Sequence, residues 1–188
     1  MDMYKLKWTR LQMEILRLLC IKSGQILNLR GIANYLKVSP TAVSNALNEL
    51  EKENLVKINK SKIMNLFSIE LNRDNPKTTE LKRIENIKMF YDSGLYDFLF
   101  NEFPGCAIIL FGSYSRGEDI LGLEDLGNMS DIDIAVIGTK GKQSDLTKFE
   151  KLLERKIILN FYHSFKEIHK HLKENIFNGF LLSGGIEL

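Results

Sequence analysis

The sequence predicts an α+β protein made of two domains, and three observations support this prediction. The chain of 188 residues is long enough for two small domains. Segments with helical periodicity alternate with short apolar segments that are typical of strands. The charge also changes along the chain: residues 1–75 hold 12 Lys and Arg against 7 Asp and Glu, whereas residues 76–188 hold 14 against 17. We therefore expect a basic domain over 1–75 and a mildly acidic domain over 76–188.

The composition narrows the class of protein further. Hydrophobic residues make up 44% of the chain and charged residues 27%, as in ordinary globular proteins. The longest uninterrupted apolar run, residues 106–111, is far too short to cross a bilayer, and the first twelve residues lack the apolar core of a signal peptide. We therefore expect a cytoplasmic protein with no membrane contact. Cys20 and Cys106 fit no disulfide framework or zinc-site spacing and are expected to be buried.

The first domain begins with two predicted helices. Over residues 9–22, Leu11, Ile15, Leu18 and Leu19 recur at helical spacing and form an apolar stripe. After Gly24, residues 26–29 predict a short strand, and a second helix is expected over residues 30–37.

The third predicted helix carries an unusual polar face. Ser39 is a good N-cap residue, and Pro40 suits the first helical position. The face opposite its apolar stripe consists of Thr41, Ser44, Asn45, Asn48 and Lys52, and it is small, polar and almost uncharged at its start. Side chains of this kind approach base edges in the major groove of DNA.

A predicted hairpin follows this helix. Residues 55–71 read as two strands around a turn near Lys60, with Lys57, Lys60 and Lys62 at the tip, where they would contact phosphates. The segment resembles the winged helix-turn-helix domains of prokaryotic transcriptional regulators over about 65 residues. The resemblance implies double-stranded DNA as a partner. A winged helix that serves only protein contacts or a homodimer is the alternative.

The second domain opens with helices. Asn75-Pro76 begins a helix that ends near Ser93-Gly94, and its predicted apolar face comprises Leu81, Ile84, Ile87 and Phe90. A short helix over residues 95–103 follows, closed by Pro104-Gly105.

A turn suited to an anion comes next. Residues 106–111 predict a buried strand that ends at Gly112-Ser113, where a helix is expected to begin. Glycine lets the backbone approach a ligand closely, and the amides of such a turn favour phosphate. Ser113 adds a hydroxyl group, and Arg116 adds a cation about one turn further on.

The next predicted strand carries two aspartates. Side chains two residues apart on a strand share a face, so Asp131 and Asp133 project together while Ile132 and Ile134 face the core. Two adjacent carboxylates repel each other unless a divalent cation lies between them, and Mg²⁺ is bound by few carboxylates plus water and substrate phosphates. The sequence therefore predicts a site for a nucleoside triphosphate and its metal ion.

The segments "FGSYSRG" and "SDIDIAV" resemble the active-site signature of the DNA polymerase β-type nucleotidyltransferase superfamily. Within it the resemblance is to minimal nucleotidyltransferases, particularly archaeal ones fused to an N-terminal winged helix. It implies a mixed sheet flanked by helices, in which Gly112 and Ser113 grip the triphosphate and Asp131 and Asp133 bind Mg²⁺ or Mn²⁺. It also implies transfer of a nucleoside monophosphate from ATP or another triphosphate to a hydroxyl group, with release of pyrophosphate.

One position departs from this family's pattern. The family commonly has a third carboxylate on the following strand, and Asn160 occupies the position expected for it. An amide brings no charge and cannot take a proton. The acids between the two motifs offer a replacement or, as we expect, form a solvated loop: Glu118, Asp119, Glu124 and Asp125.

The last part of the chain is read as scaffold. Ser144 is expected to cap a helix that runs to residue 153, and residues 164–167 form a capping box that opens another. The terminal segment from Phe180 predicts a strand or an interface.

Three functions are consistent with the whole sequence. The first is a Mg²⁺-dependent nucleotidyltransferase with a DNA-binding winged helix. The second is a transcriptional regulator whose degenerate transferase domain senses a nucleotide, and the third is an antitoxin-like nucleotidyltransferase that acts on a partner toxin. The acceptor and the preferred base do not follow from the sequence.

Overall fold

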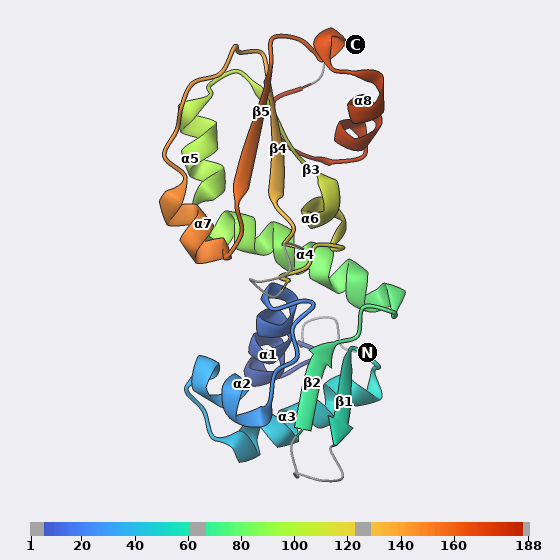
Figure 1. The fold of residues 1–188 in the computed structure, drawn as a ribbon. Helices are drawn as coiled ribbons and strands as arrows, with labels where there is room; N and C mark the ends of the chain where they lie inside the picture. Colours follow the sequence, from blue (N-terminus) through green and yellow to red (C-terminus); the bar gives the residue numbers. More distant parts are fainter. Residues whose placement is uncertain (1–5, 61–66, 123–128, 186–188) are drawn as a thin grey trace. The chain divides into compact units, whose positions relative to one another are not determined.

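The computed structural model describes residues 6–60, 67–122 and 129–185. The chain divides into two compact units, Met1–Thr79 and Glu80–Leu188, whose elements are labelled in Figure 1. The division falls between Thr79 and Glu80, inside one helix.

The first unit is a winged helix, as predicted. Its elements are α1 (Arg10–Ile21), α2 (Leu29–Leu36), α3 (Pro40–Lys52), β1 (Val56–Lys60) and β2 (Phe67–Leu71). The two strands form an antiparallel hairpin, in which Val56 pairs with Leu71 and Lys60 with Phe67. The three helices enclose a core of fully buried side chains that includes Ile15, Leu19, Ile32, Val43, Leu47 and Leu50.

Side-chain caps fix where these helices begin. Ser39 accepts a hydrogen bond from the Ala42 amide and Pro40 is the first helical residue, as predicted. Asn28 caps α2 by accepting from the Gly31 amide at 2.8 Å, and such caps contribute about 1 kcal/mol each. The predicted strand at 26–29 is wrong, because only Leu27 bridges to Ile69 before Asn28 starts the helix.

A charged junction follows the end of α3. Glu53 accepts hydrogen bonds from Lys7 at 2.7 Å, from Lys77 at 2.6 Å and from the Trp8 indole at 3.1 Å. Burial acts to raise the pKa of Glu53, but these three donors outweigh it and lower the pKa to about 2. The junction therefore ties the start of the chain to α3 and to the segment after the wing.

The second unit is built on a mixed four-stranded sheet, which confirms the predicted fold class. Its strands are β3 (Ala107–Phe111), β4 (Ile132–Ile137), β5 (Ile157–Tyr162) and β6 (Phe180–Ser183), in the order β5-β4-β3-β6. The β4 and β5 strands are parallel and the other neighbours antiparallel. The remaining elements are α4 (Pro76–Asp92), α5 (Leu95–Glu102), α6 (Gly112–Arg116), α7 (Thr147–Leu153), the 3-10 turn η2 (Phe165–Glu167) and α8 (Lys170–Phe177).

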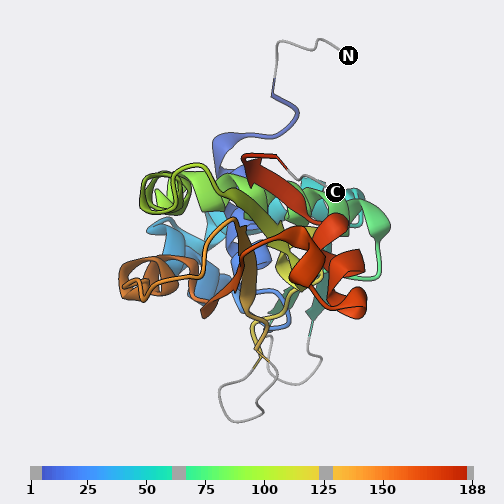
Figure 2. The same ribbon diagram turned by 90° about the horizontal axis from the view of Figure 1, so that it is seen from above.

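Helices cover both faces of this sheet. Figures 1 and 2 show α5 and α7 on one side and α8 on the other. The α8 side packs Ile168 and Ile176 against Ala107, Ile109, Ala135 and other sheet residues. Because Phe111 pairs with Asp133 and Ile109 with Ala135, Asp133 lies on this same face. It stands at the end of the sheet where β3 finishes and β4 begins.

The buried side of α4 differs from the predicted one. Phe90 is buried as expected, but Ile84 is 59% exposed. Lys82 and Asn86 are each only 1% exposed. A helix-period reading could not anticipate this, because it assigns charged and amide side chains to the solvent face.

Several local predictions in the last third of the chain are also corrected. Ser144 does not cap a helix; Asp145 accepts from the Thr147 amide at 3.0 Å, and α7 begins there. The expected capping box at 164–167 is a 3-10 turn instead, and α8 begins at Lys170. The terminal segment does form a strand, β6, which pairs with β3. Among the described residues, no helix has the length and apolar character needed to cross a membrane.

Candidate functional site

The two sequence motifs meet at one end of the second sheet. Phe111, the last residue of β3, pairs with Asp133, and the chain then turns at Gly112 with a φ of 78°. A β-carbon added at Gly112 would lie 2.6 Å from the Asp133 Oδ2 atom. The positive φ favours glycine there, and an added β-carbon would have to displace the Asp133 carboxylate. The turn backbone therefore lies directly against one carboxylate of the aspartate pair.

The carboxylates of Asp131 and Asp133 repel each other. Asp131 is exposed just before β4, Asp133 is half-buried on it, and Ile132 and Ile134 are fully buried as predicted. Burial, and then the charge of Asp131, raise the pKa of Asp133 above its ordinary value. A cation between the two carboxylates would relieve both causes. The donor set suits Mg²⁺ or Mn²⁺, since water and phosphate oxygens supply the other ligands.

Ser113 and Arg116 occupy the short α6 helix that follows Gly112. Ser113 is partly buried, and its carbonyl accepts from the Glu118 amide at 3.0 Å. Arg116 is exposed and donates to Glu118 at 2.7 Å. An exposed ion pair of this kind is weak, so Arg116 can exchange Glu118 for a phosphate. Because α6 spans only five residues, the amides of the turn matter more than a helix dipole.

The strand register places a residue other than Asn160 at the position expected for a third carboxylate. In the parallel pair of β4 and β5, Asp133 lies opposite Ile158, and Asn160 lies opposite Ala135. Asn160 shares the face of Asp133 but is displaced by two residues along the strand. Ile158, 42% exposed, is the direct neighbour of Asp133 on β5. The predicted placement of Asn160 beside the two aspartates is therefore corrected to Ile158.

The acids between the motifs do not behave as one solvated loop. Glu118 is exposed, as expected, but Asp119 is 1% exposed and bonded to charged partners. Glu124 and Asp125 lie outside the described residues. Within the described ranges, no group of three His, Cys, Asp or Glu residues is placed to hold a metal ion. Among the described residues, Asp131 and Asp133 are thus a pair and not part of a larger cluster of metal-binding side chains.

The polar face predicted for the third helix is present on α3. Thr41, Asn45 and Asn48 are exposed on it and Ser44 is half-buried, while the opposite side of the helix enters the core. The exposed side chains are uncharged and short, and Asn and Thr are among the side chains that can contact base edges.

Of the three lysines predicted at the tip of the wing, two lie within the described residues. Lys60 ends β1, is exposed and lies with its ammonium group 5.6 Å from the centre of the Phe67 ring. Lys62 lies outside the described residues. Lys57 is not at the tip, because β1 begins at Val56, and it pairs with Asp74.

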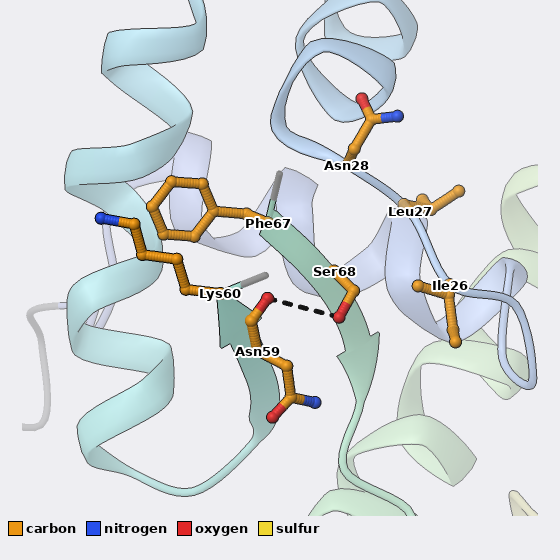
Figure 3. A pocket seen from close by; sticks show the side chains of 7 residues that line it. All are labelled: Ile26, Leu27, Asn28, Asn59, Lys60, Phe67 and Ser68. Atoms are coloured by element: carbon orange, nitrogen blue, oxygen red, sulfur yellow. Dashed lines mark hydrogen bonds between the residues drawn. The ribbon is translucent and has the colours of Figure 1, made fainter. Parts of the chain in front are cut away.

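A groove of about 350 Å³ runs beside the wing (Figure 3). The Ser68 hydroxyl donates to the Asn59 carbonyl at 3.4 Å across the hairpin that forms one wall. The seven residues that line it are Ile26, Leu27, Asn28, Asn59, Lys60, Phe67 and Ser68. Its mixture of apolar and amide side chains was not predicted, because it joins two segments that are distant in sequence.

Comparison with known families agrees with the two units. Residues 8–62 match the MarR family, and residues 97–183 match the nucleotidyltransferase domain. No curated protein matches the chain.

Among solved structures, similarity is found to MarR-family proteins. A variant of Lactococcus lactis ZitR is 28% identical, with 53% of this chain and 64% of that chain covered and a TM-score of 0.41. Wild-type ZitR in complex with DNA gives 28% identity, the same coverage and a TM-score of 0.40. The adhesin competence repressor of Streptococcus pyogenes is 22% identical over 54% of this chain and 71% of that one, with a TM-score of 0.41. The chain thus spans less than two thirds of the length of these two ZitR chains.

Proposed function

Because the chain joins a MarR-family winged helix to a nucleotidyltransferase domain, we propose that it is a DNA-binding, metal-dependent nucleotidyltransferase. In this proposal the C-terminal domain binds a nucleoside triphosphate with Mg²⁺ and transfers its nucleoside monophosphate to an acceptor hydroxyl. The observation that carries the proposal is the contact between the Gly112 turn and Asp133, where an added β-carbon would be 2.6 Å from the carboxylate. It brings a phosphate-binding turn and a metal clamp to one point.

The roles of the residues follow from this contact. Asp131 and Asp133 hold the cation, whose charge offsets that of the triphosphate. The turn amides and the Ser113 hydroxyl bind the terminal phosphates. The acceptor oxygen forms a bond to the α-phosphorus, the bond from that phosphorus to its bridging oxygen breaks, and pyrophosphate leaves. Ile158 offers no base, so the proton of the acceptor passes to water.

The N-terminal domain would bring this chemistry to DNA. Thr41, Asn45 and Asn48 are exposed on one helix face, and Lys60 is exposed at the end of β1. Neutral side chains for base edges and a cation for phosphate are the two kinds of contact that a DNA-binding domain combines. The groove beside Lys60 is part of the same proposed surface.

A second candidate function is a nucleotide sensor that binds without transfer. It is favoured by one observation, the placement of Ile158 rather than a carboxylate opposite Asp133. Without that carboxylate the site lacks the charge and the proton acceptor that speed transfer. In this case the bound triphosphate would regulate DNA binding.

Titration calorimetry with ATP, GTP, CTP and UTP, with Mg²⁺ and with EDTA, tests the shared premise. Binding that is equal in EDTA would refute the metal clamp. The double variant Asp131→Asn, Asp133→Asn should lose the metal-dependent part of binding and remain folded. Incorporation of α-labelled nucleotide into candidate acceptors then separates the transferase from the sensor.

A further inference from the structure

The second unit holds a buried charged cluster that no step of the proposed reaction uses. Asp119 is 1% exposed and accepts from Lys82, from the Asn86 amide at 2.7 Å and from the Arg155 guanidinium at 3.1 Å. Lys82 and Asn86 come from α4, and Arg155 comes from the connection between α7 and β5. One carboxylate therefore joins three separate parts of the second unit.

The first connection from this cluster leads to the phosphate-binding turn. The Asn86 side-chain amide donates to the Tyr114 carbonyl at 2.8 Å as well as to Asp119. Tyr114 lies in α6, two residues after Gly112. The same buried amide therefore holds the turn and the carboxylate together.

The second connection leads to Asp131. Ile120, the residue after Asp119, is bonded to Ser130 in both directions: the Ser130 amide donates to the Ile120 carbonyl at 3.0 Å, and the Ile120 amide donates to the Ser130 hydroxyl at 3.0 Å. Ser130 immediately precedes Asp131. The Ile120–Ser130 pair thus fixes the approach to the first clamp carboxylate.

The third connection reaches the backbone between the two aspartates. Arg155, bound to Asp119, is followed by Lys156, whose carbonyl accepts from the Ile132 amide at 2.8 Å. Ile132 separates Asp131 from Asp133. The backbone of the clamp is therefore held from both of its sides by segments that Asp119 organises.

We propose that Asp119 is the positioning residue of this site: held by Lys82, Asn86 and Arg155, it sets the phosphate-binding turn and the aspartate pair in register. The ligand part of this inference rests on the proposed function. Stability alone does not explain the cluster, because buried ion pairs are often no more stabilising than apolar side chains of similar volume. What such a network does supply is directional bonds that select one arrangement of the segments it joins.

Two Asp119 variants and a control test the proposal. Asp119→Asn keeps the shape but leaves two buried cations facing an amide, so the double variant Asp119→Asn, Lys82→Met removes one of those cations. The control is Ile137→Ala, a core change at the opposite end of β4, which lowers stability without touching the cluster. We compare Mg²⁺-ATP affinity by calorimetry, the melting temperature, and hydrogen exchange of residues 112–117 and 130–132 in the ligand-free protein.

The expected result is a loss of Mg²⁺-ATP affinity of at least about tenfold in the Asp119 variants, with faster exchange confined to those two segments. The control should keep its affinity within about twofold at a similar loss of melting temperature. Equal losses in control and variants, or native affinity and exchange in the variants, would overturn the proposal. If both Asp119 variants fail to fold, native binding by Arg155→Lys, which keeps the charge but not the fork, would overturn it as well. If the native protein binds no Mg²⁺-ATP, the proposed function fails, and the exchange pattern still decides the positioning role.

Discussion

A substitution at Ile158 tests the geometry of the site most directly. Paired residues on neighbouring strands are about 5 Å apart, and two residues along a strand add about 6.6 Å. A carboxylate at 158 would therefore stand about 5 Å from Asp133, whereas one at 160 would be about 8 Å away. Ile158→Asp should complete a three-carboxylate site, and Asn160→Asp should not.

The size of the effect can be worked from this separation. Two unit charges about 5 Å apart at an effective dielectric constant of about 20 repel by about 3 kcal/mol. Because Ile158 is 42% exposed, water and salt reduce this to about 1–2 kcal/mol. Ile158→Asp should lose that much stability without a cation. Bound Mg²⁺ relieves the repulsion and gains a ligand, so affinity should rise about tenfold or more, which corresponds to about 1.4 kcal/mol.

The assay is Mg²⁺ and Mn²⁺ titration of the native protein, Ile158→Asp, Asn160→Asp and the uncharged control Ile158→Asn, each with urea unfolding in EDTA. Ile158→Asn separates the loss of the apolar side chain from the gain of charge. Nucleotide incorporation by Ile158→Asp shows whether the restored carboxylate also restores transfer. The reasoning is refuted if Asn160→Asp tightens the metal at least as much as Ile158→Asp. Brisk transfer by the native protein would contradict the role given to this position.

Four further outcomes are expected. Gly112→Ala should weaken Mg²⁺-triphosphate binding by about tenfold or more, measured by calorimetry, because its β-carbon displaces the Asp133 carboxylate and its positive φ costs about 1–2 kcal/mol. The pKa of Asp133 is raised, so this carboxylate takes up a proton at a higher pH than an ordinary aspartate does. As the pH falls through this higher range, Mg²⁺ affinity should fall, whereas the stability of the metal-free protein should rise. Asp133→Asn should remove both trends. Ionised Glu53 stabilises the folded protein fully above about pH 4.5, and this contribution is lost as the pH falls to about 2. Glu53→Gln should therefore lower the free energy of unfolding by about 1–2 kcal/mol at neutral pH, measured by urea unfolding. This figure allows for solvent screening of the half-exposed Lys7 and Lys77. In DNA-binding assays across salt concentrations, Lys60→Ala should weaken binding to all DNA sequences similarly, whereas Asn45→Ala should reduce the discrimination between sequences by about 1–3 kcal/mol. The absence of any DNA binding at low salt would assign the winged helix to protein contacts.

The features that could be predicted from the sequence are those encoded locally. Ser39 and Pro40 predict the start of α3. The alternation of apolar and carboxylate side chains around Asp133 predicts which side chains of β4 enter the core. Both signals depend on neighbours within a few residues, so no tertiary information is needed.

The features that escaped prediction depend on distant partners. Which residue of β5 lies beside Asp133 is decided by the register of two strands separated by α7, and an offset of two residues keeps the same face while changing the neighbour. Lys82 and Asp119 are far apart in sequence, and each by itself looks like a solvent-facing charge. Their burial becomes interpretable only when the fold brings them together.

The two hydrogen bonds between Ile120 and Ser130 have an evolutionary consequence. These bonds hold Ile120 and Ser130 together just before Asp131, so the chain leaves at Ile120 and returns at Ser130 at fixed points. Lengthening a closed segment is inexpensive, because each doubling adds only about 0.6 kcal/mol of closure entropy. Insertions between these two residues can therefore accumulate without moving Asp131 or Asp133.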